Sequence, residues 1–346
     1  MKRLKTALAI ATGMSVALGI RARRRRRWYG LSGRTVLVTG GSRGLGLALA
    51  RQAASQRARV AICGRDSGTL ERARARLERA GAEVLAQTAD VRDRCAVEEL
   101  VSAVERRFGS IDVLINNAGV IEVGPAELMS VADYEEAMAT NFRGTLYATL
   151  AVLPGMRARR SGRIVNITSI GGRIAVPHLL PYTASKFAAF GLSQGLRAEL
   201  APKGIYVTAV CPGLMRTGSP RNATFVGRPR AEYAWFSIAD SLPGLTISAE
   251  RAARLILEAC KRGDPELCFP TSTRAAVIIN AVAPALTARM LGLAARLLPG
   301  PGARPARRPG AESQSWFSPS ILTRLTERAA QEHNQIVSGA IPVHRG

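Results

Sequence analysis

The stretch RTVLVTGGSRGLG at residues 34–46 decides the fold of this chain. Its first half, from Arg34 to Thr39, is a short apolar run rich in β-branched residues, which is typical of a buried strand. The glycines after it indicate a tight turn, and a helical pattern follows from Leu47 to Gln56. In such a unit the glycines let the backbone approach a pyrophosphate, and the helix N-terminus offers N–H groups and a positive dipole end. The stretch therefore predicts a dinucleotide-binding α/β unit.

A second motif, Tyr182-Thr183-Ala184-Ser185-Lys186, indicates acid/base chemistry, and Ser169 precedes its tyrosine by thirteen residues. Residues 182 and 186 are one helical turn apart in the segment 181–200, whose pattern predicts a helix, so their side chains share one face. A tyrosine titrates near ~10 when unperturbed, and a neighbouring cation favours its ionised form. We therefore expect Lys186 to lower the pKa of Tyr182 toward the range of proton transfer at neutral pH.

Further signals follow in chain order. The apolar run 111–115 predicts a strand that leads into Asn116-Asn117-Ala118-Gly119, whose small residues allow close packing against a cofactor or a neighbouring turn. Asn141 lies in a helical stretch, and Pro212-Gly213 follows the predicted strand 205–210. Strand and helix patterns alternate from residue 34 to residue 270, which predicts an α/β fold with a Rossmann-like, doubly wound parallel sheet flanked by helices.

With these landmarks in this order, the chain resembles the short-chain dehydrogenase/reductase family over residues 32–270. The resemblance implies an oxidoreductase that interconverts a ketone and a secondary alcohol by hydride transfer with a nicotinamide cofactor. It implies that Tyr182 is the acid/base and that Lys186 lowers its pKa and binds the nicotinamide ribose. Ser169 would hold the substrate oxygen. Asn141 would anchor a water that links Lys186 to solvent.

The resemblance also implies a cofactor-binding set drawn from the glycine turn and the ends of several strands. Besides Tyr182 and Lys186, this set comprises Thr39, Gly40, Ser42, Arg43, Gly44, Leu45, Gly46, Arg65, Asp90, Val91, Asn117, Ala118, Gly119, Pro212, Gly213 and Thr217.

Charge favours NADP(H) over NAD(H), because Arg43 and Arg65 are placed to clamp a 2′-phosphate. NAD(H) stays an alternative cofactor because of Asp66, since a carboxylate at the ribose would accept hydrogen bonds from an unphosphorylated cofactor. Asp90 would contact the adenine, or it would cap the helix that begins near Asp93.

Length and composition predict one large domain with extensions, because 346 residues at 47% hydrophobic content can bury a sizeable core. We expect a basic, apolar, membrane-associating segment at 1–31 and the catalytic domain at 32–270. A helical extension would occupy 271–346, with a Pro/Arg linker at 299–310. Pro284 would divide the apolar stretch 274–298 into two short helices. A polar helix would occupy 318–335.

The cysteines and histidines suggest neither a disulfide framework nor a metal site. The five cysteines, at positions 63, 95, 211, 260 and 268, are odd in number and not closely paired in sequence, which indicates buried thiols in a reducing compartment. The three histidines lack metal-ligand spacing, and His178 reads as a loop residue, although it could approach a substrate.

The net charge of +24 is concentrated near the N-terminus, since fifteen of the 49 lysines and arginines precede Asp66, the first acidic residue. The uncharged, largely apolar stretch 6–20 lies between basic residues on both sides. As a helix it would be about 22 Å long, which is short of the ~30 Å hydrocarbon core. An interfacial anchor on the anionic cytoplasmic face, with Trp28 and Tyr29 at the headgroups, suits it best. A spanning segment, a cleaved signal and a disordered basic tail are the alternatives.

The segment 214–246 is expected to select the substrate, because it follows Pro212-Gly213 and in this family closes over the active site. Its aromatic residues favour a lipophilic ketone or alcohol, or else they form the packing core of the lid itself. They are Phe225, Tyr233, Trp235 and Phe236. Its arginines would instead select an acyl carrier or a coenzyme A thioester. They are Arg216, Arg221, Arg228 and Arg230.

Two other classes of function are weighed against the enzyme. A catalytically silent NADP(H)-binding sensor would be expected to lack Tyr182, Lys186 or Ser169, and all three are present. A nucleic-acid-binding protein would use the arginine block, with binding that weakens steeply with salt, but the pattern favours a membrane surface over any specific nucleic acid. The family resemblance implies a homodimer or homotetramer.

Overall fold

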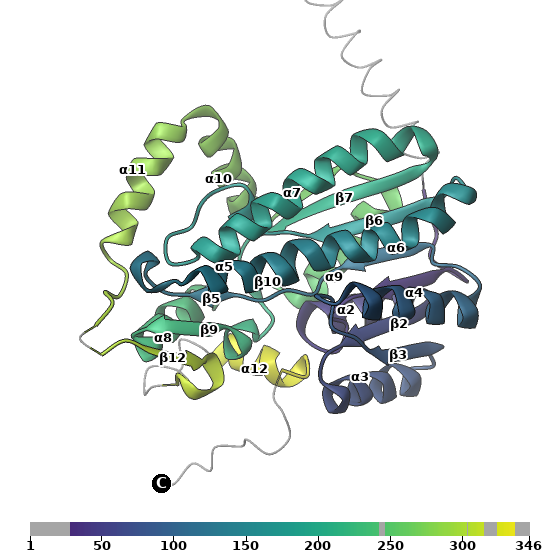
Figure 1. The fold of residues 1–346 in the computed structure, drawn as a ribbon, viewed down its shortest axis with the longest axis horizontal. Helices are drawn as coiled ribbons and strands as arrows, with labels where there is room; N and C mark the ends of the chain where they lie inside the picture. The colour runs from purple at the N-terminus through teal and green to yellow at the C-terminus, as the bar shows by residue number, and fades with distance from the viewer. Residues whose placement is uncertain (1–27, 242–245, 303, 315–323, 336–346) are drawn as a thin grey trace, which may run out of the picture.

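A seven-stranded parallel sheet forms the centre of the molecule, in the strand order β11-β7-β6-β4-β1-β2-β3 (Figure 1). The computed structural model describes residues 28–241, 246–302, 304–314 and 324–335. The strand order reverses between β1 and β4, which is the switch point of a doubly wound fold. The predicted fold class is therefore confirmed. The strands of this sheet are β1 (Thr35–Val38), β2 (Arg59–Gly64), β3 (Val84–Thr88), β4 (Val113–Asn116), β6 (Gly162–Ile167), β7 (Ile205–Pro212) and β11 (Glu266–Phe269).

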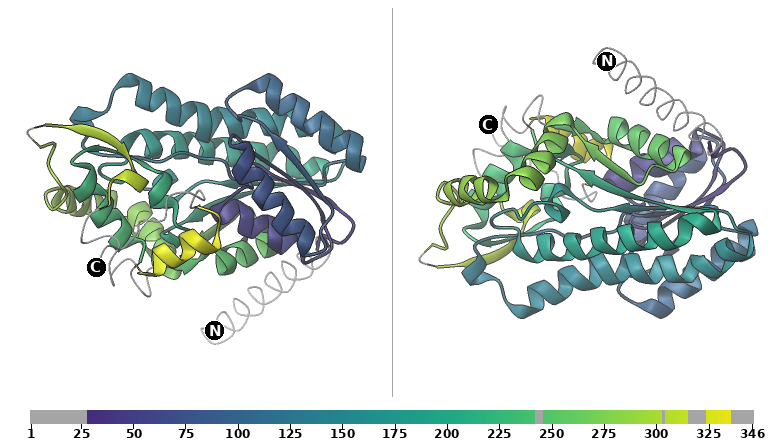
Figure 2. Two further views of the ribbon diagram at one scale, coloured as in Figure 1. Left: turned by 90° about the horizontal axis from the view of Figure 1, so that it is seen from below. Right: turned by 90° about the horizontal axis from the view of Figure 1, so that it is seen from above.

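Helices cover both faces of the sheet (Figure 2). One face packs against α2 (Gly44–Ala54), α3 (Ser67–Arg79) and α9 (Ala249–Arg262). The other packs against α4 (Arg94–Phe108), α6 (Gly144–Ala158) and α7 (Leu180–Leu200). Val36 and Val38 of β1 belong to the first core and Leu37 to the second, because successive side chains of a strand point to opposite faces.

Local signals fix where the helices begin. The Asp66 carboxylate accepts the Thr69 N–H at 2.7 Å and caps α3. The Asp93 carboxylate accepts the Cys95 N–H at 2.8 Å and caps α4, so the alternative in which Asp90 caps this helix is wrong. The helix α5 (Val131–Ala137) continues through a π-helical segment, η2 (Met138–Arg143), into α6. Asn141 lies in that segment, and such π-turns often occur at functional sites.

The predicted linker at 299–310 is in part a strand. β12 (Ala306–Pro309) pairs antiparallel with β9 (Thr224–Gly227), which also pairs with β5 (Glu122–Val123). Arg307 of β12 forms an ion pair with Asp133. The proline and arginine composition concealed this edge strand, because a proline is tolerated at a sheet edge and the pairing partner is remote in sequence.

The C-terminal region contains two short helices, as Pro284 predicted. These are α10 (Thr271–Val282) and α11 (Pro284–Ala295), and α8 (Pro229–Ala239) and α12 (Arg324–Glu332) complete the set. Residues 318–323 of the predicted final helix lie outside the described residues. A two-stranded pair and five 3₁₀ turns make up the rest, namely β8 (Met215–Arg216), β10 (Ile247–Ser248), η1 (Ala126–Leu128), η3 (Ile170–Gly172), η4 (Ala201–Lys203), η5 (Ser219–Asn222) and η6 (Gly310–Glu312).

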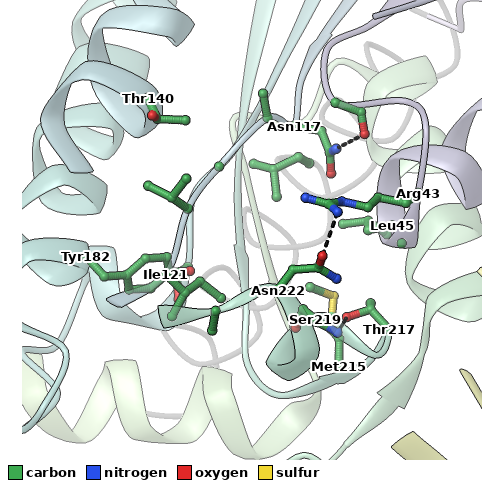
Figure 3. Close-up of a pocket in the computed structure, with 18 of the residues that line it drawn as sticks. Arg43, Leu45, Asn117, Ile121, Thr140, Tyr182, Met215, Thr217, Ser219 and Asn222 are labelled. Atoms are coloured by element: carbon green, nitrogen blue, oxygen red, sulfur yellow. Dashed lines mark hydrogen bonds between the residues drawn. The ribbon is translucent and has the colours of Figure 1, made fainter. Parts of the chain in front are cut away.

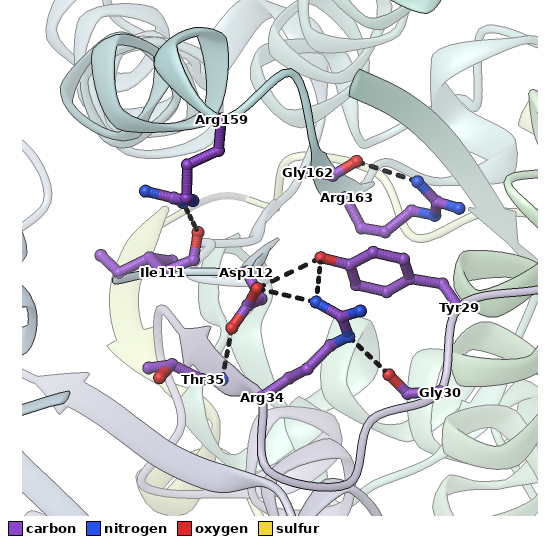
Figure 4. Close-up of polar contacts among 9 residues, drawn as sticks. All are labelled: Tyr29, Gly30, Arg34, Thr35, Ile111, Asp112, Arg159, Gly162 and Arg163. Atoms are coloured by element: carbon purple, nitrogen blue, oxygen red, sulfur yellow. Dashed lines mark hydrogen bonds and ion pairs between the residues drawn. The ribbon is translucent and has the colours of Figure 1, made fainter. Parts of the chain in front are cut away.

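Tyr29 belongs to the folded domain and does not face a membrane (Figure 4). Its ring stacks with the Arg34 and Arg163 guanidinium groups, and its hydroxyl donates to Asp112 at 3.2 Å. The expectation for Tyr29 is therefore wrong, because its burial between two cations fixes it at the sheet. Residues 1–27, the main part of the predicted membrane segment, lie outside the described residues. Within the described ranges, no helix combines the length and apolarity needed to cross a bilayer.

Two cysteines come together although they are distant in sequence. The register of β7 and β11 sets Cys211 beside Cys268, which the absence of close sequence spacing did not predict. Cys95 is exposed, so the expectation of buried thiols is wrong at that position.

Candidate active site

A cavity of about 590 Å³ opens at the carboxyl ends of the central strands (Figure 3). This is where ligands bind in doubly wound folds. Thr39, Gly46 and Asn141 lie behind its wall, and the other predicted site residues line it. Those are Gly40, Ser42, Arg43, Gly44, Leu45, Arg65, Asp90, Val91, Asn117, Ala118, Gly119, Ser169, Tyr182, Lys186, Pro212, Gly213 and Thr217.

The glycine turn is held against the segment that follows β4. The Thr39 hydroxyl accepts the N–H groups of Asn117 at 3.0 Å and Ala118 at 3.2 Å. The Asn117 amide donates back to the carbonyls of Thr39 and Gly40, both at 3.1 Å. A Cβ at position 46 would lie 2.1 Å from the Gly40 carbonyl oxygen, so only glycine fits there. These contacts hold the two segments rigidly beside each other.

This cradle fits a dinucleotide. The first N–H groups of a helix have no intrahelical acceptor and attract anions. Leu45, in the first turn of α2, lines the cavity. The N-terminus of α2 could therefore hold a pyrophosphate, and Arg65, Asp90, Tyr182 and Lys186 would line the space on either side of it.

Tyr182, Ser169 and Lys186 meet in the inner part of the cavity. Burial raises the pKa of Tyr182 to about 12, against a hydrogen bond with Ser169 that lowers it. The Ser169 hydroxyl also accepts the Gly171 N–H at 3.0 Å, which orients it. Burial lowers the pKa of Lys186 to about 8, and its ammonium donates to the Ile167 carbonyl at 3.0 Å.

The pKa of Tyr182 is raised, whereas the sequence led us to expect that Lys186 lowers it. The Lys186 Nζ lies 5.6 Å from the centre of the Tyr182 ring and is bonded to a main-chain carbonyl. Loss of water around the phenol therefore outweighs the neighbouring cation, because desolvation penalises the charged form. Side-chain spacing predicted that the two residues meet, but it could not predict the degree of burial.

Asn141 fixes the framework behind Tyr182 and Lys186. Its carboxamide exchanges hydrogen bonds with the main chain of Val120, at 3.0 and 3.1 Å, and donates to the Ser185 hydroxyl at 2.9 Å. Ser185 in turn donates to the Tyr182 carbonyl at 2.7 Å. Asn141 thus ties η2 to the first turns of α7, and Ser185, which the sequence analysis did not single out, is the link.

The outer part of the cavity carries the groups that bear on the choice of cofactor. Arg43 donates to the Asn222 side chain at 2.6 Å. Burial lowers the pKa of Arg43 and the nearby Arg65 charge lowers it further, whereas the Asp66 carboxylate opposes this shift. Asp66 is engaged as the cap of α3. Asp90 is paired with Arg92 at 2.7 Å, and this pairing helps to hold the pKa of its carboxyl below the ordinary value although partial burial opposes it.

The substrate side of the cavity is mainly apolar. Of the four aromatic residues expected here, Trp235 and Phe236 line the cavity, whereas Phe225 and Tyr233 are fully buried in the lid's own core. The Trp235 indole donates to buried Glu232 at 2.6 Å. The other Glu232 oxygen contacts His178 at 2.9 Å, so His178 is a loop residue that helps to orient the lid.

Asp240 is a further polar group in the cavity that the sequence analysis did not single out. Its side chain is buried at 3% exposure, and burial raises the pKa of its carboxyl to about 8. It follows α8 directly, and its charge would raise the pKa of Tyr182. No motif marks this position. Only its place after an apolar helix of the predicted lid could have drawn attention to it.

Comparisons with known proteins agree with this geometry. The sequence profile described as short chain dehydrogenase matches residues 34–224. A putative ketoacyl reductase of Streptomyces coelicolor is 42% identical over 183 residues, which are 52% of this chain and 70% of that protein. A short-chain dehydrogenase/reductase structure from Burkholderia phymatum in complex with NAD is 25% identical, with a TM-score of 0.68 over 75% of this chain and 96% of that one. A structure of an actinorhodin polyketide ketoreductase variant with NADPH is 34% identical, with a TM-score of 0.62 over 68% of this chain and 95% of that one.

Proposed function

Because this chain belongs to the short-chain dehydrogenase/reductase family and is an oxidoreductase of CH–OH groups that uses NAD(P), we propose that it interconverts a ketone and a secondary alcohol on a lipophilic substrate with NADP(H). The observation that carries the proposal is the meeting of Tyr182, Ser169 and Lys186 in one cavity with the glycine cradle. The catalytically silent sensor is the alternative, and it predicts dinucleotide binding without turnover.

The residues have the following roles in reduction. Tyr182 donates its phenolic proton to the carbonyl oxygen, and Ser169 donates a hydrogen bond to that same oxygen as charge develops. A nicotinamide bound in the cavity supplies the hydride. Lys186 stabilises the phenolate that forms when Tyr182 gives up its proton, and it binds the nicotinamide ribose. Asn141 holds the first turns of α7 in place and anchors a water that links Lys186 to solvent.

Two observations support NADP(H) over NAD(H). Arg43 and Arg65 line the outer cavity, and the Arg65 charge lowers the pKa of Arg43, so a 2′-phosphate would offset the repulsion between the two cations. Asp66 already accepts the Thr69 N–H as the cap of α3, which competes with a role in binding the ribose.

A lipophilic substrate is supported by the side chains opposite Tyr182. Ile121, Val176, Leu179, Trp235 and Phe236 line that side of the cavity. Of the four lid arginines that would select an acyl carrier or coenzyme A, Arg216 bonds to Thr246 and buried Arg221 pairs with Glu327, whereas Arg228 and Arg230 are exposed. A thioester substrate therefore stays an alternative, and it would have to use Arg228 and Arg230.

An anionic membrane surface on the cytoplasmic side is supported by α10 and α11. These helices and the turn after them expose seven large apolar side chains at half or more of their surface: Ile278, Ile279, Val282, Leu286, Met290, Leu293 and Leu297. Residues 271–311 contain six arginines and no acidic residue. Apolar contact combined with positive charge is the pattern of interfacial helices. We expect a homodimer or homotetramer, as the family resemblance implies.

The test is turnover by the purified full-length protein in mild detergent. NADPH and NADH oxidation would be followed against lipophilic ketones and acyl thioesters, with Tyr182→Phe as the matched variant. We expect turnover with NADPH that falls by at least about 10²-fold in the variant, because the proton donor is lost. Tight NADPH binding without turnover on any ketone would favour the sensor.

A further inference from the structure

The segment 324–335, which we name the C-terminal strap, lies against the glycine turn. The His333 carbonyl accepts the Gly44 N–H at 2.8 Å. The Asn334 amide donates to the carbonyls of Ser42 at 2.9 Å and Thr69 at 3.0 Å. A segment at the far end of the chain therefore bonds directly to the main chain that forms the cradle.

Further contacts fix the strap on both sides of the cofactor region. On α3, Arg76 donates to the Glu332 carbonyl at 2.7 Å, and Arg72 donates to the Asn334 side chain at 3.3 Å. On the lid side, Arg221 pairs with Glu327 at 3.0 Å. The strap thus connects the nucleotide half of the domain to the substrate lid.

The end of the strap reaches the cavity itself. Gln335 lines the cavity, and a Cβ at position 44 would lie 2.6 Å from its amide nitrogen. The side-chain oxygen of Gln335 accepts from the Asn222 side chain at 2.5 Å, and the Asn222 side-chain oxygen accepts from Arg43 at 2.6 Å. Figure 3 shows Arg43 and Asn222 meeting across the opening. A chain of hydrogen bonds therefore runs from the glycine turn through the lid to the strap.

The strap adds to the wall of the cavity and leaves its interior open. Of the strap residues, Gln335 alone lines the cavity. The strap bonds to the Gly44 N–H, whereas Leu45, the next residue of α2, lines the open cavity. The strap and a bound pyrophosphate can therefore occupy the N-terminus of α2 together.

We propose that residues 324–335 form part of the cofactor site and hold bound NADP(H) in place, so that the cofactor leaves only when this strap loosens. The proposal rests on the proposed function, since it takes NADP(H) as the occupant of the cavity. It assigns to Asn334 a positioning role, fixing the strap on the turn, and to Gln335 a direct place in the wall of the site.

The test compares two variants of the full chain. Asn334→Gly removes the bonds to Ser42 and Thr69, and glycine accepts the left-handed backbone of this position, where φ is 58°. Arg328→Ala is the matched control, because its side chain is 78% exposed on α12, within the same strap. NADPH dissociation would be measured by stopped-flow displacement and its Kd by titration. Hydrogen exchange of residues 324–335 would be followed with and without NADPH.

We expect Asn334→Gly to raise the dissociation rate and the Kd about tenfold, corresponding to one or two net hydrogen bonds, with no change in Arg328→Ala. Exchange in the strap of the wild type should slow when NADPH binds. Unchanged rates in Asn334→Gly overturn the proposal, as do faster association and tighter binding, which would make the strap a plug. If the variant does not fold, unchanged exchange in the wild type overturns it. Failure of the wild type to bind NADPH or NADH overturns the proposed function as well.

Discussion

Replacing Asp240 by asparagine should stabilise the protein, by an amount that grows with pH. The Asp240 side chain is buried at 3% exposure, and burial raises the pKa of its carboxyl from 3.8 to about 8. In the unfolded chain this carboxyl is ionised at neutral pH, whereas the folded protein keeps it protonated. The unfolded state therefore binds fewer protons, and the free energy of unfolding must fall as pH rises from about 4 to about 8.

The size of the effect follows from the shift. Each pKa unit corresponds to about 1.4 kcal/mol, so the contribution of Asp240 falls by about 1.4 kcal/mol per pH unit in this window and levels off at about 6 kcal/mol. Asparagine does not titrate. Between pH 4 and pH 7, the free energy of unfolding of Asp240→Asn should therefore rise by about 4 kcal/mol relative to that of the wild type. Tyr182, which interacts with Asp240, has a pKa of about 12, so its own titration lies outside the window.

The assay is urea unfolding of wild type and variant at pH 5, 6, 7 and 8 at constant ionic strength. Changes in packing or hydrogen bonding alter the free energy of unfolding of Asp240→Asn by the same amount at every pH. The test is therefore how the difference in free energy of unfolding between the variant and the wild type changes with pH. Asp66→Asn is the control, because the hydrogen bond with Thr69 lowers the pKa of this exposed cap. The stabilising contribution of Asp66 is lost only as pH falls below the ordinary pKa of an aspartate. The free energy of unfolding of Asp66→Asn, compared with that of the wild type, should therefore differ by a constant amount from pH 5 to pH 8. If the free energies of unfolding of the wild type and of Asp240→Asn change in parallel with pH, the reasoning is refuted.

Two further predictions concern the cofactor site. Gly46→Ala should abolish NADPH binding in calorimetric titration, because the new Cβ would lie 2.1 Å from the Gly40 carbonyl oxygen. Gly191→Ala is the control and should bind NADPH normally, because the space around its Cβ is open. Normal NADPH binding by Gly46→Ala would contradict the role of the cradle. Arg43→Ala should raise the Kd for NADPH about tenfold or more through the loss of a charge-assisted hydrogen bond and leave the Kd for NADH nearly unchanged; equal changes for the two cofactors would argue against a 2′-phosphate clamp.

The central sheet and the cradle could be predicted from sequence because their signals are local. The run 34–46 contains its own strand, turn and helix start, and Tyr182 and Lys186 are neighbours on any helix. Pro284 divides α10 from α11 by the same kind of local rule, since a proline cannot continue a helix.

The remaining features depend on contacts between distant residues. β12 pairs with β9 across the lid, and Cys211 meets Cys268 through strand register. Asn334 reaches the glycine turn, and Gln335 reaches the cavity, only because the chain after α12 packs beside that turn. None of these positions carries a motif, since an asparagine or an arginine-rich strand is common on any surface. Their roles arise from the fold, so a sequence pattern could not reveal them.

The protonation of Tyr182 and Lys186 shows most clearly what spacing alone leaves open. Spacing predicted that Lys186 would lie behind Tyr182, but the sign of the tyrosine shift depends on how completely the surrounding protein excludes water. Burial keeps Tyr182 a phenol, with a pKa of about 12, while Lys186, with a pKa of about 8, remains mainly an ammonium at neutral pH. A phenol beside an ammonium is the state that must donate a proton to a carbonyl oxygen. Oxidation of an alcohol would first require removal of that proton.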